Sequence, residues 1–579
     1  MHYTRLAVQD AIGDHALIAD GRTAALIDTS GNIVWLCWPR IDSTPFLFGL
    51  LDDVRGGVFS VRPRRADARV ITRRYDPGTL VLESVWQVGR SRLTVSECLA
   101  WDGPRRLLRR LRCDGDPVDV VLRFAPSVDM GATRVEGRRL HVAGGGLGVS
   151  VLSPAQWTIA HETALSDFAV AEGELPFVVL QDTHDGEAEP PQAALEATLS
   201  VWTERFAGGT LAISPLAARA IGEERARELL VTTRAVLVGL TQRGGGIVAA
   251  PTTSLPQWPG SSRTWDYRYC WMRDAALAGT AMLRLGCADS AVALATFLGG
   301  VLEDSALPSL VRIDGTPPPA ERVIDELRGY RGARPVRLGN AAALQLQLDL
   351  PGEISQLAVA LADAGVLPGE LAAACGRLGD WIVDHWRMPD HGIWEIRSAP
   401  RHYTHSRVMA WAALRDALIL AERGLAHGDL AAWQRCAEAI HRDVTGAAGA
   451  LQLHADGGGA DAALASVPLA GFLPAVHPTM TATLDLITAR LGRSGLLDRY
   501  EGRPDGLDDP CGPFLFPTFW LATAMELCAR DGASSFRAAA NARGATGLFG
   551  EVADPADGSP LGNYPQVQSH AAFALAATT

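Results

Sequence analysis

Residues 69–101 read RVITRRYDPGTLVLESVWQVGRSRLTVSECLAW. β-Branched and aromatic residues alternate here with polar residues, and turn sequences interrupt the pattern at residues 76–78 (Asp-Pro-Gly) and 89–91 (Gly-Arg-Ser). An alternation with a period of two places apolar side chains on one face of an extended strand, and Gly, Pro and Asp favour the turns between strands. The stretch therefore predicts short strands joined by turns.

The same pattern continues through the N-terminal third of the chain. Residues 23–38 (TAALIDTSGNIVWLCW) contain two apolar runs around a Ser-Gly-Asn turn, which indicates a hairpin. Residues 118–128, 137–152 and 174–183 have similar apolar runs. Many short strands at close spacing, with no helices between them, predict an antiparallel β-sandwich, which we assign to residues 1–190.

The pattern changes at residues 186–206, GEAEPPQAALEATLSVWTERF, where a Pro-Pro break precedes helical spacing. Ala- and Leu-rich segments with helical periodicity, such as MAWAALRDALILAERG at 409–424, then fill the rest of the chain. We predict a helical linker over 191–215 and a domain of about a dozen helices over 216–579. The fold class is therefore α+β with segregated halves. Periodicity alone leaves open whether the helices close into a ring or stack as a solenoid.

The composition argues against several classes of protein. The net charge of −12 disfavours nucleic acid as the main partner, because binding phosphates requires a basic surface. The nine cysteines form no CxxC pair, and this predicts neither a disulfide framework nor a structural metal. No apolar run reaches the roughly 18 residues that span a bilayer, and the N-terminus lacks the pattern of a secretion signal. We therefore expect a soluble cytoplasmic protein.

A loop at residues 261–277, SSRTWDYRYCWMRDAAL, gathers aromatic and charged residues directly before a helix. It places Trp265 and Trp271 near Arg273 and Asp274 in the sequence. Flat aromatic faces beside fixed charges suit a sugar, which offers C–H faces and a ring of hydroxyls. The alternative is a buried ion-pair network that braces the loop against aromatic packing.

Glu395 directly follows Trp394 in a second loop, DHGIWEIRSAPRHYTHS at residues 390–406. A carboxyl packed against an indole can have the raised pKa that a general acid needs near neutral pH. The alternative is a surface glutamate that pairs with Arg397.

Two further loops contain candidate residues. Glu551 lies in the turn-rich segment at 547–570, where Asp-Pro and Asp-Gly turns explain the neighbouring aspartates and leave Glu551 as the less explained acid. The loop at 329–342, GYRGARPVRLGNAA, could bind phosphate, hydrogen-bond sugar hydroxyls or orient carboxylates. The residues behind this interpretation are Arg331, Arg334 and Arg337.

Taken together, these loops resemble glycoside hydrolase family 15, a glucoamylase-like family with a bacterial glucoamylase and trehalase branch. The matching motifs are WDYRYCWMRDAAL at 265–277, GYRGARPVRLGNAA at 329–342, GIWEIR at 392–397 and GLFGEVADP at 547–555. They occur in the family's order, and residues 12–43 also resemble the N-terminal domain of the bacterial branch.

The resemblance implies an N-terminal antiparallel β-supersandwich followed by an (α/α)6 barrel, with the site in a funnel at one end of the barrel. It implies an inverting enzyme that releases β-glucose from the non-reducing end of a small α-glucoside, either a malto- or isomalto-oligosaccharide or trehalose. The partner is then a small carbohydrate, with no nucleic acid, membrane, metal or cofactor required. The sequence leaves open whether the chain forms a homo-oligomer.

The resemblance also implies roles for individual residues. The family's general acid, the Glu after Trp in the GIWE-like motif, falls on Glu395, and its general base falls on Glu551. The Arg-Asp pair that grips the outer hydroxyls of the terminal sugar falls on Arg273 and Asp274. The residues that we expect to line the sugar subsites are Trp394, Arg334, Trp271, Tyr330 and Trp265.

The chain departs from the family pattern at two positions. Val552 follows Glu551 where the family usually has Glu or Gln, and Cys511 replaces an acid in CGPF at 511–514. Polar groups lost from a sugar site can shift specificity strongly. Two alternatives therefore stay open: a non-hydrolytic or transferring enzyme acting on a modified sugar or other metabolite, and an inactive carbohydrate-binding protein.

Overall fold

The computed structural model describes residues 9–128, 130, 132–160, 163–183, 189–206, 211–303, 307–446 and 449–578. The chain forms two compact units. The first contains Met1–Gly208, Ile324–Val336 and Gly544–Leu548, and the second contains Gly209–Val323, Arg337–Arg543 and Phe549–Thr579. Two short segments from the C-terminal part of the chain thus belong to the first unit. The domain limits at residues 190 and 215 stay a prediction.

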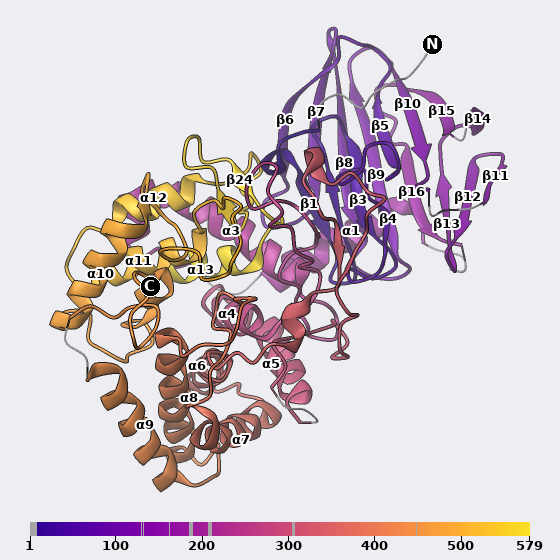
Figure 1. Cartoon of the computed structure of the whole chain (residues 1–579). Coiled ribbons are helices and arrows are strands. Elements are labelled where there is room, and N and C mark those ends of the chain that lie inside the picture. The colour runs from indigo at the N-terminus through magenta and orange to yellow at the C-terminus, as the bar shows by residue number, and fades with distance from the viewer. Residues whose placement is uncertain are drawn as a thin grey trace. The chain divides into compact units, whose positions relative to one another are not determined.

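The first unit is built on two eight-stranded sheets whose paired strands are antiparallel (Figure 1). One sheet has the order β1 (Ala16–Ala19), β2 (Ala24–Ile27), β3 (Asn32–Cys37), β5 (Val58–Pro63), β10 (Val118–Ala125), β15 (Thr163–Val170) and β14 (Thr158–Ala160), with β4 (Pro45–Leu47) paired to β3. The other has the order β11 (Ala132–Glu136), β12 (Arg139–Gly144), β13 (Leu147–Leu152), β16 (Phe177–Asp182), β9 (Arg106–Asp114), β8 (Ser91–Leu99), β7 (Leu82–Val88) and β6 (Arg69–Tyr75).

The stretch at residues 69–101 forms β6, β7 and β8, as its alternating pattern predicts. Tyr75 pairs with Leu82 across the first turn, and Val88 pairs with Ser91 across the second. Along β7 buried and half-buried residues alternate strictly, because successive side chains of a strand point to opposite faces. The prediction of strands joined by turns is therefore confirmed.

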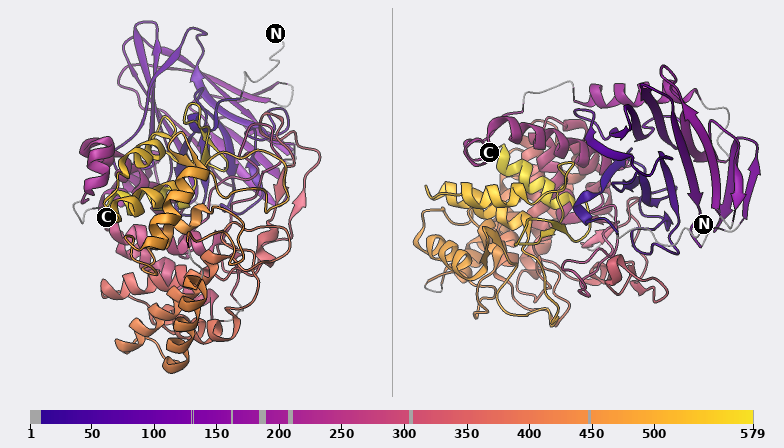
Figure 2. Two further views of the ribbon diagram at one scale, coloured as in Figure 1. Left: turned by 60° about the vertical axis from the view of Figure 1, so that its left-hand side comes forward. Right: turned by 90° about the horizontal axis from the view of Figure 1, so that it is seen from above.

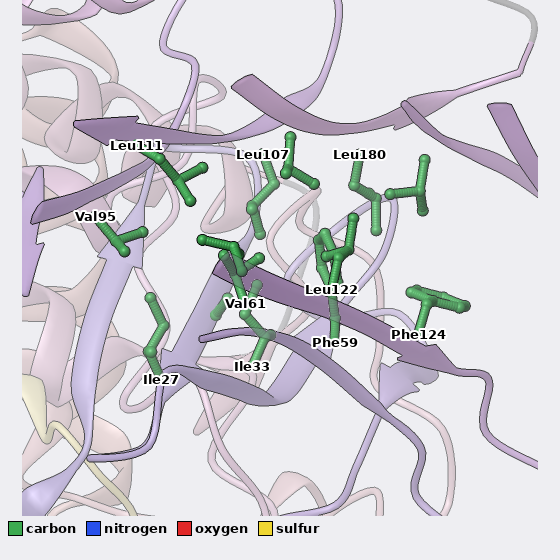
Figure 3. Close-up of a cluster of buried hydrophobic side chains, with 14 of the residues drawn as sticks. Ile27, Ile33, Phe59, Val61, Val95, Leu107, Leu111, Leu122, Phe124 and Leu180 are labelled. Carbon is green, nitrogen blue, oxygen red and sulfur yellow. The ribbon is translucent and has the colours of Figure 1, made fainter. Parts of the chain in front are cut away.

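The core of the first unit lies between the two sheets. Figure 3 shows Ile27 and Phe59 of the first sheet in one buried cluster with Val95 and Leu107 of the second. Side chains from two facing sheets that fill one core define a sandwich. Helix α1 (Pro191–Arg205) belongs to this unit, where the ring centroids of its Trp202 and of Trp101 are 4.7 Å apart.

The second unit consists mainly of helices. They are α2 (Pro215–Ile221), α3 (Glu223–Leu240), α4 (Met272–Arg284), α5 (Ala288–Val301), α6 (Leu350–Asp363), α7 (Gly369–His385), α8 (Thr404–Glu422), α9 (Leu430–Thr445), α10 (Pro478–Leu491), α11 (Leu515–Leu527), α12 (Ala533–Asn541) and α13 (Val567–Ala577). Short 3-10 segments add η1 (Ile12–Asp14) and η2 (Tyr330–Gly332) to the first unit, and η3 (Ala341–Leu344) and η4 (Ala462–Ser466) to the second. Four two-stranded ribbons complete the second unit: β17 (Cys270–Trp271) with β18 (Leu310–Val311), β19 (Arg322–Val323) with β20 (Arg337–Leu338), β21 (Gly492–Arg493) with β22 (Leu496–Leu497), and β23 (Val552–Ala553) with β24 (Pro560–Leu561).

These helices close into a ring. An inner circle runs α4, α6, α8, η4, α11 and α13, and α13 packs back against α4. In chain order the inner elements alternate with the outer helices α3, α5, α7, α9, α10 and α12 (Figures 1 and 2). Inner helices are buried on nearly every side, and eleven consecutive residues of α11, from Leu515 to Met525, are buried. The question that periodicity left open is thus settled in favour of a ring.

The alternation also determines where the connections lie. Each segment that leads from an outer helix into the next inner element reaches the ring at the same end, because the chain reverses direction at every step. Loops therefore gather at that end, where loops on a rigid scaffold commonly hold a functional site. None of the helices in the described residues combines the length and the apolarity that crossing a membrane requires.

A buried ion pair links strands β8 and β9 inside the first unit. Arg109 and Glu97 are directly opposite each other, and both are almost completely buried. The Arg109 Nε donates to Glu97 Oε1 at 2.6 Å, and its Nη1 and Nη2 donate to the carbonyls of Phe59 at 3.0 Å and Gly31 at 2.5 Å. One guanidinium thus joins both sheets of the sandwich, because Phe59 lies in β5.

We expect Glu97→Ala to destabilise the first unit by about 3–5 kcal/mol, because it leaves a buried guanidinium without its counter-charge. Urea unfolding followed by near-UV circular dichroism measures this loss. Asp167→Asn is the matched control, since Asp167 pairs with Arg64 on the surface of the same unit, where both side chains are half exposed. Equal unfolding midpoints for the two variants would contradict the role given to the buried pair.

Candidate active site

A single pocket at the loop-bearing end of the ring contains most of the predicted site residues. The space between its lining residues, open solvent included, is about 750 Å³. Every lining residue comes from a connection that enters an inner helix or from the first turn of that helix. The lining residues used below are Gln257, Arg263, Trp265, Tyr267, Trp271, Arg273, Asp274, Trp394, Glu395, Arg397, Arg499, Asp505 and Glu551.

Glu395 lies in the connection between α7 and α8. Its Oε1 accepts hydrogen bonds from Trp271 Nε1 at 2.6 Å and from Arg273 Nη2 at 2.9 Å. Its backbone has a φ of 55°, in the left-handed region that few residues other than glycine adopt. The Gln345 side chain holds this turn by donating to the Glu395 carbonyl at 3.1 Å. A strained residue at a fixed position is typical of functional sites.

Arg273 connects the Glu395 carboxylate to the interior of the ring. From the first turn of α4, its Nη1 donates to Gln347 Oε1 at 2.9 Å and to Asp349 Oδ2 at 3.1 Å, while Nη2 reaches Glu395. Arg273 and Asp349 are both buried. The Arg273 guanidinium, itself fixed by Gln347 and Asp349, therefore fixes the position of the Glu395 carboxyl. The alternative in which Glu395 pairs with Arg397 is wrong, since Arg397 forms a two-pronged pair with Glu321 at 2.7–2.8 Å.

Glu551 lies in the connection between α12 and α13 and is buried. Its Oε1 accepts from the Tyr267 hydroxyl at 2.6 Å, and its Oε2 accepts from Gln257 Nε2 at 2.8 Å. Burial raises the pKa of Glu551 above the ordinary value of a glutamate, while the two hydrogen bonds and the charge of Arg499 act in the opposite direction. Both oxygens of this carboxylate are thus held in fixed directions by neutral donors.

Two touching aromatic rings connect the two glutamates. The rings of Tyr267 and Trp271 meet edge to face, with centroids 5.4 Å apart. Tyr267 donates to Glu551, and Trp271 donates to Glu395. The carboxyls therefore share one pocket, and each is held by a different ring of the same loop.

A third carboxyl, Asp274, lines the same pocket next to Arg273. Burial raises its pKa to about 7; the Arg273 charge opposes this shift, and the carboxylates of Glu395 and Glu551 add to it. Asp274 is therefore a carboxyl of this pocket whose charge changes around neutral pH.

Aromatic side chains form two further parts of the site. Trp394 donates from Nε1 to the buried Asp461 at 2.8 Å, and its ring packs against Phe514 and Phe516 at 5.5 Å. The Trp265 ring contacts the guanidinium of Arg397 at 4.0 Å and that of Arg337 at 4.3 Å. Trp265, Trp271 and Trp394 thus line the same pocket as the two glutamates, and their role in binding a sugar stays a prediction.

The structure does not bring two of the predicted subsite residues, Arg334 and Tyr330, into this pocket. Both belong to the segment Ile324–Val336 of the first unit. Arg334 is exposed and donates to the Arg328 carbonyl at 3.4 Å, whereas the buried Tyr330 hydroxyl donates to the Asp10 carbonyl at 2.7 Å. These side chains therefore make their hydrogen bonds within the first unit.

Sequence reasoning missed several pocket residues. Arg499 contacts the ring of Phe514 at 5.0 Å, and Asp505 accepts from Arg263 at 2.5 Å. Their positions shortly before the CGPF motif were the available signal. Gln257 precedes the first motif by eight positions, and nothing in its neighbourhood marks it. Among the described residues, no group of three or more His, Cys, Asp and Glu side chains is placed to hold a metal ion.

The two departures from the family pattern differ in their surroundings. Val552 is fully buried in β23, where it pairs with Leu561. Cys511 lies next to the site, with its Sγ 3.5 Å from Gln257 Oε1. Neither substitution displaces the Glu551 carboxylate from its two donors.

Comparisons with known proteins agree over nearly all of the chain. The family described as "Glycosyl hydrolases family 15" matches residues 224–544, a range that includes Glu395 and ends just before Glu551. The family described as "Trehalase-like, N-terminal" matches residues 6–189. The trehalase of Mycolicibacterium smegmatis is 30% identical over 623 residues, covering 97% of this chain and 90% of that protein. Trehalase 1 of Sulfolobus acidocaldarius is 29% identical over 591 residues, covering 96% and 97%.

A solved structure supports the same relationship at the level of fold. A bacterial glucoamylase crystallised in complex with acarbose superposes with a TM-score of 0.69 at 14% identity, covering 99% of this chain and 96% of that chain. The predicted fold, an antiparallel β-supersandwich followed by an (α/α)6 barrel, is thereby confirmed. The chain belongs to glycosyl hydrolases family 15.

Proposed function

We propose that this glycoside hydrolase cleaves trehalose with inversion, with Glu395 as general acid and Glu551 as general base. The observation that carries the proposal is the pair of carboxyls in one pocket, each held by a different member of the Tyr267–Trp271 ring pair. Inverting glycosidases need their two carboxyls about 6.5–9.5 Å apart, so that a water molecule fits beside the sugar. An arrangement with two rings between the carboxyls supports such a separation.

The hydrogen bonds to Glu551 support its role as the base. Tyr267 and Gln257 donate to both oxygens of Glu551, and donors of this kind favour the ionised form that a base requires. In Glu395 both donors reach Oε1, and Oε2 makes no hydrogen bond within the described part of the chain. Oε2 is therefore the atom that we assign to carry the proton. The Glu395 side chain is 21% exposed, which leaves it accessible from the pocket.

The reaction then proceeds in one displacement. Glu551 takes a proton from water as the water oxygen attacks the anomeric carbon, and the bond to the glycosidic oxygen breaks. Glu395 gives its proton to that departing oxygen. Attack from the opposite face inverts the anomeric centre, so trehalose and water yield one β-glucose and one α-glucose.

The choice of trehalose rests on the relatives. The trehalases of M. smegmatis and S. acidocaldarius match the chain over both of its units. In this proposal Arg273 and Asp274, which line the pocket from the first turn of α4, bind the hydroxyls of the glucose that is attacked. Charged groups of this kind hold sugars by directional hydrogen bonds.

We expect the purified protein to release α- and β-glucose from trehalose in equal initial amounts, because only the attacked glucose inverts. Proton NMR within the first minutes, before mutarotation, measures the two anomers. Maltose and isomaltose are incubated in parallel as competing α-glucosides. Preferred cleavage of maltose or isomaltose would overturn the choice of trehalose, and α-glucose as the only first product would overturn inversion.

We expect Glu395→Gln and Glu551→Gln each to lower kcat on trehalose by about 10²–10⁴-fold, the usual contribution of one proton transfer. The two variants should differ on 4-nitrophenyl α-glucoside, whose phenolate leaves without full protonation. Glu395→Gln should regain much of its activity there, and Glu551→Gln should not.

Asp363→Asn serves as the control for these variants, since Asp363 pairs with Arg423 on the surface of the same unit. It should retain full activity on both substrates. Recovery of Glu551→Gln instead of Glu395→Gln would show that the two roles are reversed.

We expect the acidic limb of the kcat/KM profile to move to higher pH in Tyr267→Phe. The lost hydrogen bond favoured the ionised carboxylate, so the pKa of Glu551 rises, and the base is then protonated at a pH where the parent enzyme is active. Initial rates on trehalose between pH 3 and 8 give the profile. Tyr403→Phe is the control, because that buried hydroxyl has no hydrogen-bond partner among the described residues. A limb that does not move would contradict the assignment of Glu551 as base.

A further inference from the structure

Gln257 lies between Glu551 and Cys511, and its side chain contacts both. Its Nε2 donates to Glu551 Oε2 at 2.8 Å, and its Oε1 lies 3.5 Å from Cys511 Sγ. The backbone is fixed as well: the Gln257 N–H donates to the Arg263 carbonyl at 3.1 Å, and the Gly512 N–H donates to the Gln257 carbonyl at 3.0 Å. Gln257 is 2% exposed, so this amide has little freedom to move.

The thiol acts as a hydrogen-bond donor in this arrangement. Burial raises the pKa of Cys511 to about 11, so the sulfur carries its proton at neutral pH. A primary amide can be turned over to exchange its oxygen and nitrogen. Turning over the Gln257 amide would place Oε1 against the Glu551 carboxylate and NH₂ against the thiol hydrogen. The hydrogen bond to Glu551 would be lost, and the thiol would exchange its S–H···O contact for a weaker N–H···S contact, because sulfur is a weak acceptor. The thiol therefore adds to the preference for the observed orientation that the Glu551 carboxylate sets.

We propose that Gln257 is a positioning residue for Glu551, and that the Cys511 thiol helps to hold the Gln257 amide in the orientation that faces Glu551. The family pattern has an acid at the position of Cys511, and a carboxylate there would compete with Glu551 for the Gln257 amide nitrogen. The neutral thiol contacts the amide oxygen instead and leaves the nitrogen to Glu551. The inference rests on the proposed role of Glu551 as base. Gln257 would influence the reaction only through that carboxylate.

The charged and titratable groups around Glu551 define what a pH experiment can report. Tyr267 and Asp274 belong to the loop before α4 and to the first turn of α4. Glu395 lies in the α7–α8 connection, and Arg499 and Cys511 lie in the α10–α11 connection. Gln257 is neutral, so replacing it with an apolar residue of similar size removes a hydrogen bond without changing the charge of the site.

The test is the acidic limb of the kcat/KM profile on trehalose. Gln257→Met should move this limb upward by roughly one pH unit, the effect of one hydrogen bond lost by a carboxylate. Gln257→Glu should move it further, because a second carboxyl beside Glu551 disfavours its ionisation. If Gln257→Met does not fold, as judged by near-UV circular dichroism, the isosteric Gln257→Glu variant alone tests the proposal.

Variants of the cysteine test the second half of the proposal. Cys511→Ala should shift the limb in the same direction as Gln257→Met but by less, while Cys511→Ser, which keeps a donor, should restore the parent profile. Cys528→Ala is the matched control, since that thiol also donates to an oxygen, the Ala475 carbonyl at 2.9 Å, but lies away from the pocket lining.

Two results would overturn the inference: a limb unmoved in folded Gln257→Met, or identical profiles for Cys511→Ala and Cys511→Ser. Failure of the proposed function has a different signature, namely a Glu551→Gln variant that stays fully active on trehalose. The two failures can therefore be told apart in one set of assays.

Discussion

A guanidinium buried inside a protein must be paired, because an isolated charge in a medium of low polarity costs several kcal/mol. In the second unit that requirement falls on Arg273, which reaches Asp349 before α6 and Glu395 before α8 from its place on α4. One side chain thus ties together three neighbouring inner helices of the ring. The Arg273 guanidinium, whose counter-charge is the buried Asp349, also fixes the position of Glu395 by a hydrogen bond to its Oε1, and the pocket takes its shape around it.

Much of the fold could be predicted from the sequence, because its two periodicities are strong. The alternation at 69–101 led directly to β6, β7 and β8, and the Ala- and Leu-rich segments led to helices. Ring closure could not be derived from periodicity, since the contact between α4 and α13 joins helices at opposite ends of the second unit's sequence. A local pattern contains no information about such a contact, and the family resemblance supplied it.

The candidate site was predictable to a lesser degree. Residues inside dense motifs, such as Trp271, Arg273 and Glu395, lie in the pocket as expected. Arg334 stands in an equally dense motif but lies in the other compact unit. Gln257 is the opposite case. It lies outside the dense motifs, yet it belongs to the pocket, where it donates to a carboxylate 294 positions away in the sequence. Residue type and spacing could not reveal that pairing.

The ring has a further consequence for how the pocket responds to partial unfolding. The pocket takes residues from connections spread between Ala249 and Gln568, and the circle closes only when α13 packs against α4. A pocket assembled from segments so far apart in the sequence exists only in the closed ring. Local unfolding that releases any one inner helix therefore also takes the pocket apart, so the pocket can be no more stable than the ring around it.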